Sequence, residues 1–275
     1  MPELPEVETV MRTLQPKLIG LKIIAAQILL PKIIRTPDID EFKEKITGRK
    51  ILKINRRGKY LLFILNDGLN LLFHLRMTGN LVYCQQDEPL SKYTHLVLAL
   101  DNSCHLRFAD MRQFGRIWLV PASSMNSLSG FKDLGVEPLG AVFTTSYLKK
   151  ELKRRHVRIK PLLLDQTFIA GLGNIYTDEA LHRAKINPER LATTLNPREI
   201  TRLHHAIRDV LQEGIENRGT TVRDFIDGNG RPGNYQELLR VYNREGKPCR
   251  RCGQNILRKK IGGRSSYYCP ACQKI

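Results

Sequence analysis

The chain of 275 residues lacks the features of a membrane or exported protein. It has no run of about 18 apolar residues, so we expect no membrane-spanning helix. Its amino terminus has no apolar signal core and instead carries Glu3, Glu6 and Glu8. We therefore expect a cytoplasmic protein. Nothing in the sequence predicts an oligomer, so we expect a monomer.

Acidic residues are scarce relative to basic ones. Lys and Arg number 45 against 27 Asp and Glu, which gives a formal net charge of +18. Such an excess indicates a polyanionic partner, either nucleic acid or an anionic membrane surface. No basic amphipathic helix with an aromatic face stands out, which favours nucleic acid. Basic residues cluster in residues 149–160 and 241–275, as phosphate contacts require, although either cluster alone could be a solvated face.

Cysteine is also rare, and four of the six cysteines are grouped. Cys249 and Cys252 form one Cys-x-x-Cys pair, and Cys269 and Cys272 form another. This spacing predicts one structural Zn²⁺ held by four thiolates. Disulfides are the alternative, but the lack of a secretion signal disfavours them. Between the pairs we expect a β-hairpin that turns at two glycines and presents Arg264. Cys84 and Cys104, outside this group, are interpreted as packing residues.

The remaining pattern predicts an α+β chain. The spacing of Val7, Val10, Leu14 and Leu18 predicts an amphipathic helix near the amino terminus. Short apolar runs joined by turn signals then predict an antiparallel β-sandwich or flattened barrel. The expected strands cover residues 21–29, 51–55, 60–65, 69–77, 95–100, 105–108 and 116–120.

A helical module is expected next, with helices over residues 146–156, 159–166 and 175–184. A Gly-x-Gly turn precedes the third helix, but no strand or third glycine accompanies it, so we reject a dinucleotide site. The Asn174 side chain and nearby amides could instead hold a phosphate. Asn196 and Pro197 predict the start of a further helix that ends near Gly219. Residues 220–234 predict a mobile loop of a length typical of lids.

The first residues combine proline with glutamates ahead of the predicted helix. Proline at position 2 usually lets Met1 be removed, which would leave Pro2 with a free secondary amine. Such an amine is nucleophilic, because α-amines titrate near ~8 and are partly unprotonated at neutral pH. Acidic residues also suit the positive end of a helix dipole, and proline is common in a first turn. The stretch alone fits either a nucleophile or an ordinary helix start.

Three further stretches carry candidate functional side chains. Lys59 lies in a basic turn that is either a polar turn or a rigid phosphate-facing rim. Met77 ends an apolar run, where methionine is more often a core residue. Arg112 and Phe114, two residues apart, could wedge into a duplex and meet a base edge.

Together, six stretches resemble the formamidopyrimidine-DNA glycosylases. The resemblance runs along the whole chain, and the combination is specific although each stretch alone is not. The stretches are Pro2 to Thr9, Arg57-Gly58-Lys59, His74 to Met77, Leu164-Asp165-Gln166, Gly173 to Tyr176, and the ribbon from Cys249 to Cys272.

The resemblance implies a fold with three parts. These are an N-terminal helix plus β-sandwich catalytic domain (1–130), a helix-two-turns-helix DNA-binding domain (131–240) with a lesion-recognition loop (220–234), and a zinc ribbon (241–275). It also implies a bifunctional DNA glycosylase and AP lyase of base excision repair, acting on 8-oxoguanine opposite cytosine and on formamidopyrimidines. The implied partner is double-stranded DNA that contains oxidised bases or abasic sites. No membrane partner is implied.

The family's residue roles are carried over in the same way. Pro2 would attack C1′ and form a Schiff base, and Glu3 would move protons. Lys59 and Arg264 would serve β- and δ-elimination. Met77, Arg112 and Phe114 would fill the space of the extruded base. Further DNA contacts are expected at His74, His95, Arg155, His156, Asn174 and Tyr242, and the lesion loop would act through Thr220, Thr221, Val222, Arg223, Asp224 and Phe225.

Two positions depart from the family pattern, namely Thr78, where relatives often carry Glu, and Phe225, where Tyr is common. Two rival hypotheses stay open. One is an endonuclease VIII-like glycosylase for oxidised pyrimidines, from whose usual opening Leu4 departs. The other is a zinc-ribbon protein that binds DNA without catalysis.

Overall fold

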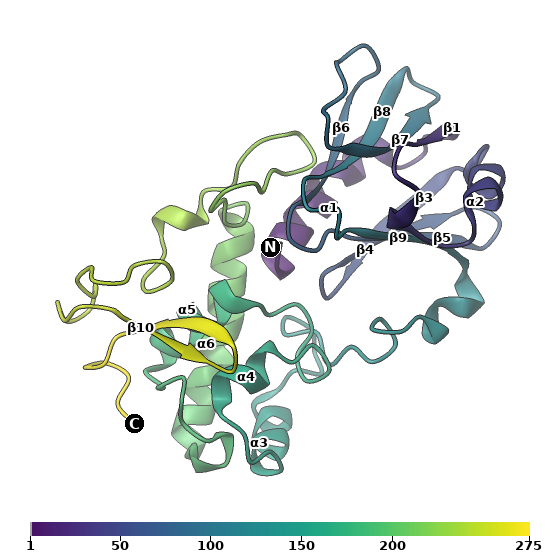
Figure 1. Cartoon of the computed structure of the whole chain (residues 1–275). Helices are drawn as coiled ribbons and strands as arrows, with labels where there is room; N and C mark the ends of the chain where they lie inside the picture. The colour runs from purple at the N-terminus through teal and green to yellow at the C-terminus, as the bar shows by residue number, and fades with distance from the viewer. Residues whose placement is uncertain (1) are drawn as a thin grey trace. The chain divides into compact units, whose positions relative to one another are not determined.

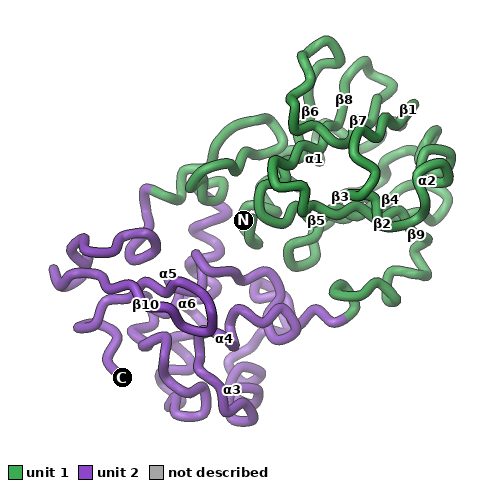
Figure 2. The backbone as a smooth tube through the Cα atoms, viewed as in Figure 1, with its two compact units in different colours: residues 1–132, 217–236 green, residues 133–216, 237–275 purple. Residues whose placement is uncertain are grey.

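The computed structural model describes residues 2–275. The chain forms two compact units, shown in green and purple in Figure 2. Unit 1 consists of residues 1–132 and 217–236, and unit 2 of residues 133–216 and 237–275. The 220–234 loop therefore belongs with the N-terminal sequence. The division into three domains remains a prediction, since compactness alone does not separate the ribbon from the helices.

Helix α1 (Leu4–Leu18) packs the apolar face that the sequence predicts. Val7, Val10, Leu14 and Leu18 are fully buried in the core of unit 1. Glu3 is the N-cap residue and Glu6 completes a capping box, so the helix begins at Leu4. This start places Pro2 and Glu3 at the edge of a packed core.

Two sheets form the rest of unit 1 (Figure 1). One has the strand order β1-β7-β8-β6 and the other β2-β9-β5-β4-β3. All pairings are antiparallel except β2 with β9. The strands are β1 (Ile23–Ile28), β2 (Ile34–Thr36), β3 (Ile51–Arg57), β4 (Tyr60–Leu65), β5 (Leu69–His74), β6 (Gly79–Gln85), β7 (Thr94–Leu100), β8 (Cys104–Asp110) and β9 (Arg116–Pro121).

The core of unit 1 lies between these sheets and α1. Phe63, Phe73 and Phe108 are fully buried, and the rings of Phe73 and Phe108, from different sheets, are 6.0 Å apart. Cys104 belongs to the same core, as its interpretation as a packing residue requires. Helix α2 (Ile39–Ile46) buries Phe42 and Ile46. The predicted β-sandwich is confirmed, whereas β2, β6 and α2 were not predicted.

Unit 2 is helical and ends in a hairpin. Its helices are α3 (Thr145–Lys153), α4 (Ile159–Leu164), α5 (Asn174–Ala184) and α6 (Pro197–Glu216), and its strands are β10 (Leu257–Ile261) and β11 (Arg264–Tyr268). Unit 2 also has a short 3₁₀ turn at Ala192–Thr194, whereas those at Pro31–Ile33 and Ala122–Ser127 lie in unit 1 and that at Tyr235–Glu237 lies at the boundary of the units. The hairpin turns at Gly262 and Gly263, both with positive φ, as predicted. Within residues 2–275, no helix is long and apolar enough to cross a lipid bilayer.

Candidate active site

Glu6 links the amino terminus to the 220–234 loop, 214 residues away in sequence. One carboxylate oxygen accepts the Glu3 amide at 2.7 Å, and the other accepts the Thr220 amide at 2.7 Å. Glu3 and Glu6 are 2% and 1% exposed. Pro2 is buried beside them. The predicted removal of Met1 concerns a residue outside the described part of the chain.

The loop is anchored to unit 1 on both sides of its tip. Asn80 on β6 bonds to the Asp224 carbonyl and the Ile226 amide at 3.2 and 3.3 Å. Phe225 is 7% exposed and belongs to the core of unit 1. Val222 and Arg223, by contrast, are exposed at the tip. The structure thus gives the loop fixed ends, while its action as a lid remains a prediction.

Within the loop, Thr221 closes the chain on itself. Its hydroxyl donates to the Phe225 carbonyl at 2.8 Å and accepts the Gly233 amide at 2.9 Å. Its own amide donates to Gln236 at 2.9 Å. These bonds hold residues 221–225 as a short arch, so a ligand could displace the tip without unravelling the stem.

Lys59 is held in the turn between β3 and β4. Its side chain is buried, with 7% exposure, so the turn is more than a solvated basic loop. Gly58 adopts φ +54°, a conformation that favours glycine. Arg56 donates to the Gly58 carbonyl at 3.0 Å and to Glu8 of α1 at 2.8 Å. Helix α1 therefore braces the turn that carries Lys59.

His74 on β5 pairs with Tyr60, the residue that follows Lys59, and its imidazole is neutral. Its Nδ1 accepts the Arg76 amide at 3.0 Å, and its ring meets Tyr60 edge-on at 4.6 Å. Burial, followed by the charges of Arg76 and Lys59, lowers the pKa of His74 to about 3. Because Nδ1 accepts, the proton is on Nε2. His74 is 8% exposed, so its contact with DNA remains a prediction.

Met77, Arg112 and Phe114, which the sequence singled out, come together at one exposed tip. The Arg112 guanidinium lies 3.2 Å from the Met77 sulfur and 4.9 Å from the Phe114 ring centroid. Met77 and Phe114 are 39% and 45% exposed. Large apolar side chains with this exposure are available to a partner.

Asp110 organises that tip and was not predicted. Its fully buried carboxylate accepts the Arg112 and Gly115 amides at 3.2 and 2.6 Å and also the Thr78 hydroxyl. The backbone carbonyl oxygen of Asp110 accepts a hydrogen bond from Nε2 of the His95 ring at 2.8 Å. His95 is only 6% exposed and contacts the tip through this hydrogen bond to Asp110. Its contact with DNA remains a prediction.

In unit 2, Asn174 and the hairpin that carries Arg264 are joined through one carbonyl. The Ser265 carbonyl accepts the Asn174 amide group at 3.0 Å and the Lys160 ammonium at 2.9 Å. Lys160 also pairs with Asp178 at 2.6 Å, and both are buried. Asp178 in turn accepts the Tyr267 amide at 2.9 Å. The exposed Arg264 thus projects from a hairpin fixed to α4 and α5.

Burial of charge has a cost that this arrangement must offset. Burial raises the pKa of Asp178, and the ion pair with Lys160 and the Tyr267 amide oppose that rise. Asn174 Oδ1 is buried and, within the described chain, makes no hydrogen bond. A buried acceptor of this kind is available to a donor brought by a ligand.

Glu179 fixes the segment before the ribbon. Its fully buried carboxylate accepts three consecutive amides, those of Arg240, Val241 and Tyr242, at 2.9–3.0 Å. The Tyr242 ring meets Tyr267 of the hairpin at 5.2 Å. Tyr242 is thereby held against the same hairpin as Arg264.

Arg155 and His156 are not drawn into this cluster. Arg155 lies 3.4 Å from Glu151 and over the ring of Phe168 at 5.0 Å, whereas His156 is exposed. The DNA contacts of Arg155 and His156 therefore remain predictions.

The four grouped cysteines form one metal-ligand set. Their sulfurs all lie within 4.8 Å of one another, and Cys252 lies 3.5 Å from both Cys269 and Cys272. Four thiolates at ~2.3 Å from a tetrahedral Zn²⁺ would be about 3.8 Å apart, so the set fits zinc. Cys249 and Cys269 are buried, and Cys252 is exposed. A full set of protein ligands makes this a structural centre.

Family models match three successive parts of the chain. Residues 1–117 match the formamidopyrimidine-DNA glycosylase N-terminal domain, residues 134–226 its H2TH domain, and residues 246–275 the zinc finger found in FPG and IleRS. The chain belongs to the formamidopyrimidine-DNA glycosylase family.

Individual relatives agree with this assignment. A formamidopyrimidine-DNA glycosylase of Pelotomaculum thermopropionicum is 71% identical over 275 residues, which is the whole of both chains. Lactococcus lactis Fpg in complex with DNA containing N7-benzyl-Fapy-dG is 38% identical, with a TM-score of 0.93 and full coverage of both chains. The same enzyme in complex with abasic-site DNA has a TM-score of 0.93 at 38% identity, covering 99% of this chain and 100% of that one.

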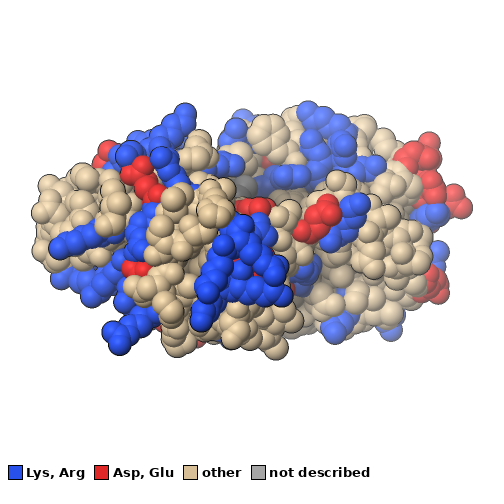
Figure 3. Space-filling view, turned by 90° about the horizontal axis from the view of Figure 1, so that it is seen from below, with Lys and Arg blue, Asp and Glu red and all other residues tan. Residues whose placement is uncertain are grey.

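The surface charge of this chain is consistent with the composition. Lys and Arg gather in several groups on the face drawn in Figure 3, where Asp and Glu are fewer. Sequence reasoning missed Asp110 and the linking role of Glu6. An acidic residue just before the Arg112–Phe114 tip was a usable signal for the first, whereas no local signal predicts the second.

Proposed function

We propose that this glycosylase excises oxidised purines from double-stranded DNA and then cleaves the strand. The observation that carries the proposal is the Pro2-Glu3-Glu6 arrangement within a chain whose family membership is shown. The relatives' complexes with Fapy-dG and abasic DNA support the choice of substrate. The reaction would take place in the cytoplasm, where bacterial DNA lies.

The first step is displacement of the damaged base. The unprotonated Pro2 amine attacks C1′, the glycosidic bond breaks, and the base leaves with a proton. Glu3 is placed at the same helix start and would move the protons that open the sugar ring. Ring opening yields an iminium, that is, a Schiff base between Pro2 and C1′.

The second step removes both phosphates. The iminium acidifies the C2′ proton, whose loss expels the 3′ phosphate, and a further elimination expels the 5′ phosphate. Lys59 is the proposed proton donor for the first elimination and Arg264 for the second. Asn174 would contact the backbone phosphates through its Nδ2 donor group, which also donates to the Ser265 carbonyl, together with nearby backbone amides.

The base must leave the helical stack before attack. Met77, Arg112 and Phe114 would occupy the vacated space, with Arg112 facing the unpaired cytosine. Asp110 and Thr78 hold this tip in place. The exposed residues of the 221–225 arch would cover the extruded base.

Reductive trapping tests the proposal most directly. Borohydride should lock the full-length enzyme covalently onto a duplex with 8-oxoguanine opposite cytosine, and peptide mapping should place the adduct on Pro2. A version with an uncleaved N-terminal extension blocks the amine and should give neither trapping nor cleavage. Full activity of the extended protein would contradict the proline mechanism.

The same assay separates the two rivals. A thymine-glycol duplex tested in parallel should be cleaved more slowly than the 8-oxoguanine duplex, and the reverse order would favour an oxidised-pyrimidine glycosylase. A non-catalytic DNA-binding protein would bind both duplexes and trap neither.

A further inference from the structure

A buried histidine lies against the zinc-binding set and has no part in the proposed reaction. His182 is in the last turn of α5 and is 1% exposed. Its Nε2 lies 3.5 Å from the sulfur of Cys249, which is itself 3% exposed. His182 is not one of the residues whose ligand atoms all lie within 4.8 Å of one another, so it is not a ligand.

The surroundings of the ring decide which nitrogen carries its proton. Nδ1 is buried and has no hydrogen-bond partner among the described residues. With the proton on Nδ1, a buried donor would be unpaired and the Nε2 lone pair would face a sulfur. With the proton on Nε2, the donor meets an acceptor and only a ring lone pair is left without a partner. The second tautomer avoids the desolvation cost of an unpaired donor.

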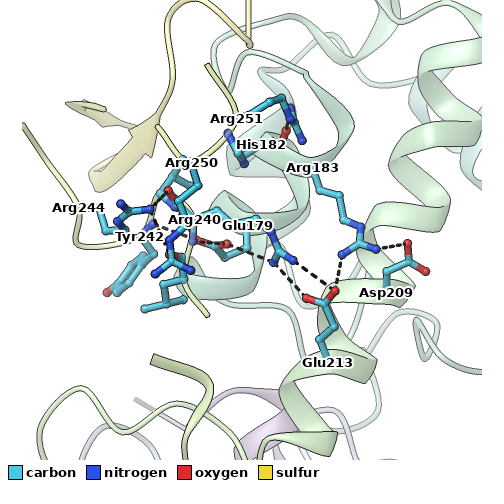
Figure 4. A network of polar contacts seen from close by, with 12 residues as sticks. Glu179, His182, Arg183, Asp209, Glu213, Arg240, Tyr242, Arg244, Arg250 and Arg251 are labelled. Carbon is cyan, nitrogen blue, oxygen red and sulfur yellow. Dashed lines mark hydrogen bonds and ion pairs between the residues drawn. The ribbon is translucent and has the colours of Figure 1, made fainter. Parts of the chain in front are cut away.

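Arginines of residues 240–251 lie in one polar network with His182 (Figure 4). Figure 4 shows His182 on α5 with Arg251 beside it and with Arg240 and Arg244 in the same network. Arg251 also bonds to the His182 carbonyl at 3.1 Å, which fixes the end of the helix relative to the ribbon.

We propose that His182 is an outer-sphere positioning residue of the zinc centre, donating an Nε2–H hydrogen bond to the Cys249 thiolate. The Arg251 amide donates to the same sulfur at 3.4 Å, so Cys249 would receive two donors. Hydrogen bonds to an ionised acceptor are roughly twice as strong as neutral ones. The two donors therefore stabilise the thiolate form that binds zinc, and they couple helix α5 directly to the metal site.

The test compares two replacements in the full-length protein. His182→Phe keeps a ring in the cavity and removes the donor, whereas His182→Gln keeps an N–H at the position of Nε2. We expect zinc release to a chelator to be about tenfold faster in H182F, a size typical for loss of an outer-sphere partner. H182Q should release zinc at close to the wild-type rate.

Replacing Zn²⁺ by Co²⁺ provides a spectroscopic signal, the sulfur-to-metal charge-transfer band, that a change in packing alone would not shift. A hydrogen bond lowers the energy of the sulfur lone pairs, so its loss in H182F should move the sulfur-to-Co²⁺ charge-transfer band to longer wavelength. H182Q should retain the wild-type band. His204→Phe is the matched control, because His204 is another histidine of unit 2, bonded instead to the Phe143 carbonyl at 2.8 Å.

Each outcome bears on the proposal. Fast release and a shifted band in H182F alone support it. Equal release from H182F and H182Q, whether fast or slow, or an unshifted band in H182F, overturns it. None of these readings depends on glycosylase activity, so the proposed reaction and the zinc hydrogen bond stand or fall separately.

Discussion

The helix that begins beside Pro2 in unit 1 and the hairpin that bears Arg264 in unit 2 are held by different physical means. In unit 1, α1 and two sheets enclose a continuous apolar core, and Pro2 and Glu3 stand at the end of its central helix. In unit 2, the hairpin that bears Arg264 is fixed by buried charge, through Lys160, Asp178 and Glu179, and by four cysteines.

This difference predicts two patterns of failure. Apolar burial is spread over many side chains, so each lost methyl group costs ~1 kcal/mol or less. Buried charges are stable only while every partner is present, so the loss of one partner is severe. Substitutions in the apolar core of unit 1 should therefore lower stability in small steps, whereas loss of one partner of the buried charges in unit 2 should lower stability sharply.

Optical probes can separate the two units. The sequence has one tryptophan, Trp118, and it lies on β9 of unit 1. Most of the longer helical segments, including the 20-residue α6, lie in unit 2 and dominate helical circular dichroism. Denaturation followed by Trp118 fluorescence therefore reports on unit 1, and circular dichroism at helical wavelengths reports mainly on unit 2.

The largest effect is expected from removing a zinc ligand. Cys252→Ser should lose zinc and DNA binding together, because metal binding supplies ~10–16 kcal/mol to the folding of such ribbons. Metal analysis and a lesion-duplex binding assay on the same preparation would measure both. Cys84→Ser is the matched control, since Cys84 lies on β6 outside the ribbon and should keep both properties. Normal lesion binding by zinc-free C252S would contradict the role given to the ribbon.

The next largest effect is expected at the buried ion pair. Lys160→Met leaves the Asp178 carboxylate buried without its cation and should destabilise unit 2 by about 3–5 kcal/mol. The transition seen by circular dichroism should move to lower urea, and the Trp118 transition should move little.

A double-mutant cycle provides its control. Lys160→Met combined with Asp178→Asn removes both charges and should be more stable than K160M alone. Additive losses would show that the two side chains do not act as a pair, and equal shifts of both transitions would show that the units unfold as one.

Local patterns explain how much of this architecture could be predicted. The apolar spacing of α1 and the spacing of the four cysteines are short-range signals, and the structure confirms both. Helix α2 was missed although Asp38 is its N-cap, accepting the amides of Asp40 and Glu41. Strand β6 was missed because it begins with Gly79 and is half-exposed, which weakens the alternation of apolar residues.

Long-range polar contacts could not be predicted in the same way. Glu6 meets Thr220 across 214 positions, and no local pattern records that contact. Lys160 was counted within a basic cluster, yet it is fully buried against Asp178. In a sequence, a buried charge looks like a surface charge, because the partner that permits burial lies elsewhere in the chain.

The smallest effect is expected in the apolar core of unit 1. Ile54 is fully buried on β3, opposite Phe63 on β4. Ile54→Val removes one methyl group and should cost about 1 kcal/mol, because the neighbouring side chains relax only in part. The Trp118 transition should move slightly and the circular dichroism transition hardly at all. A loss as large as that expected for K160M would mean that unit 1 also depends on single positions, and the contrast between the two units would fail.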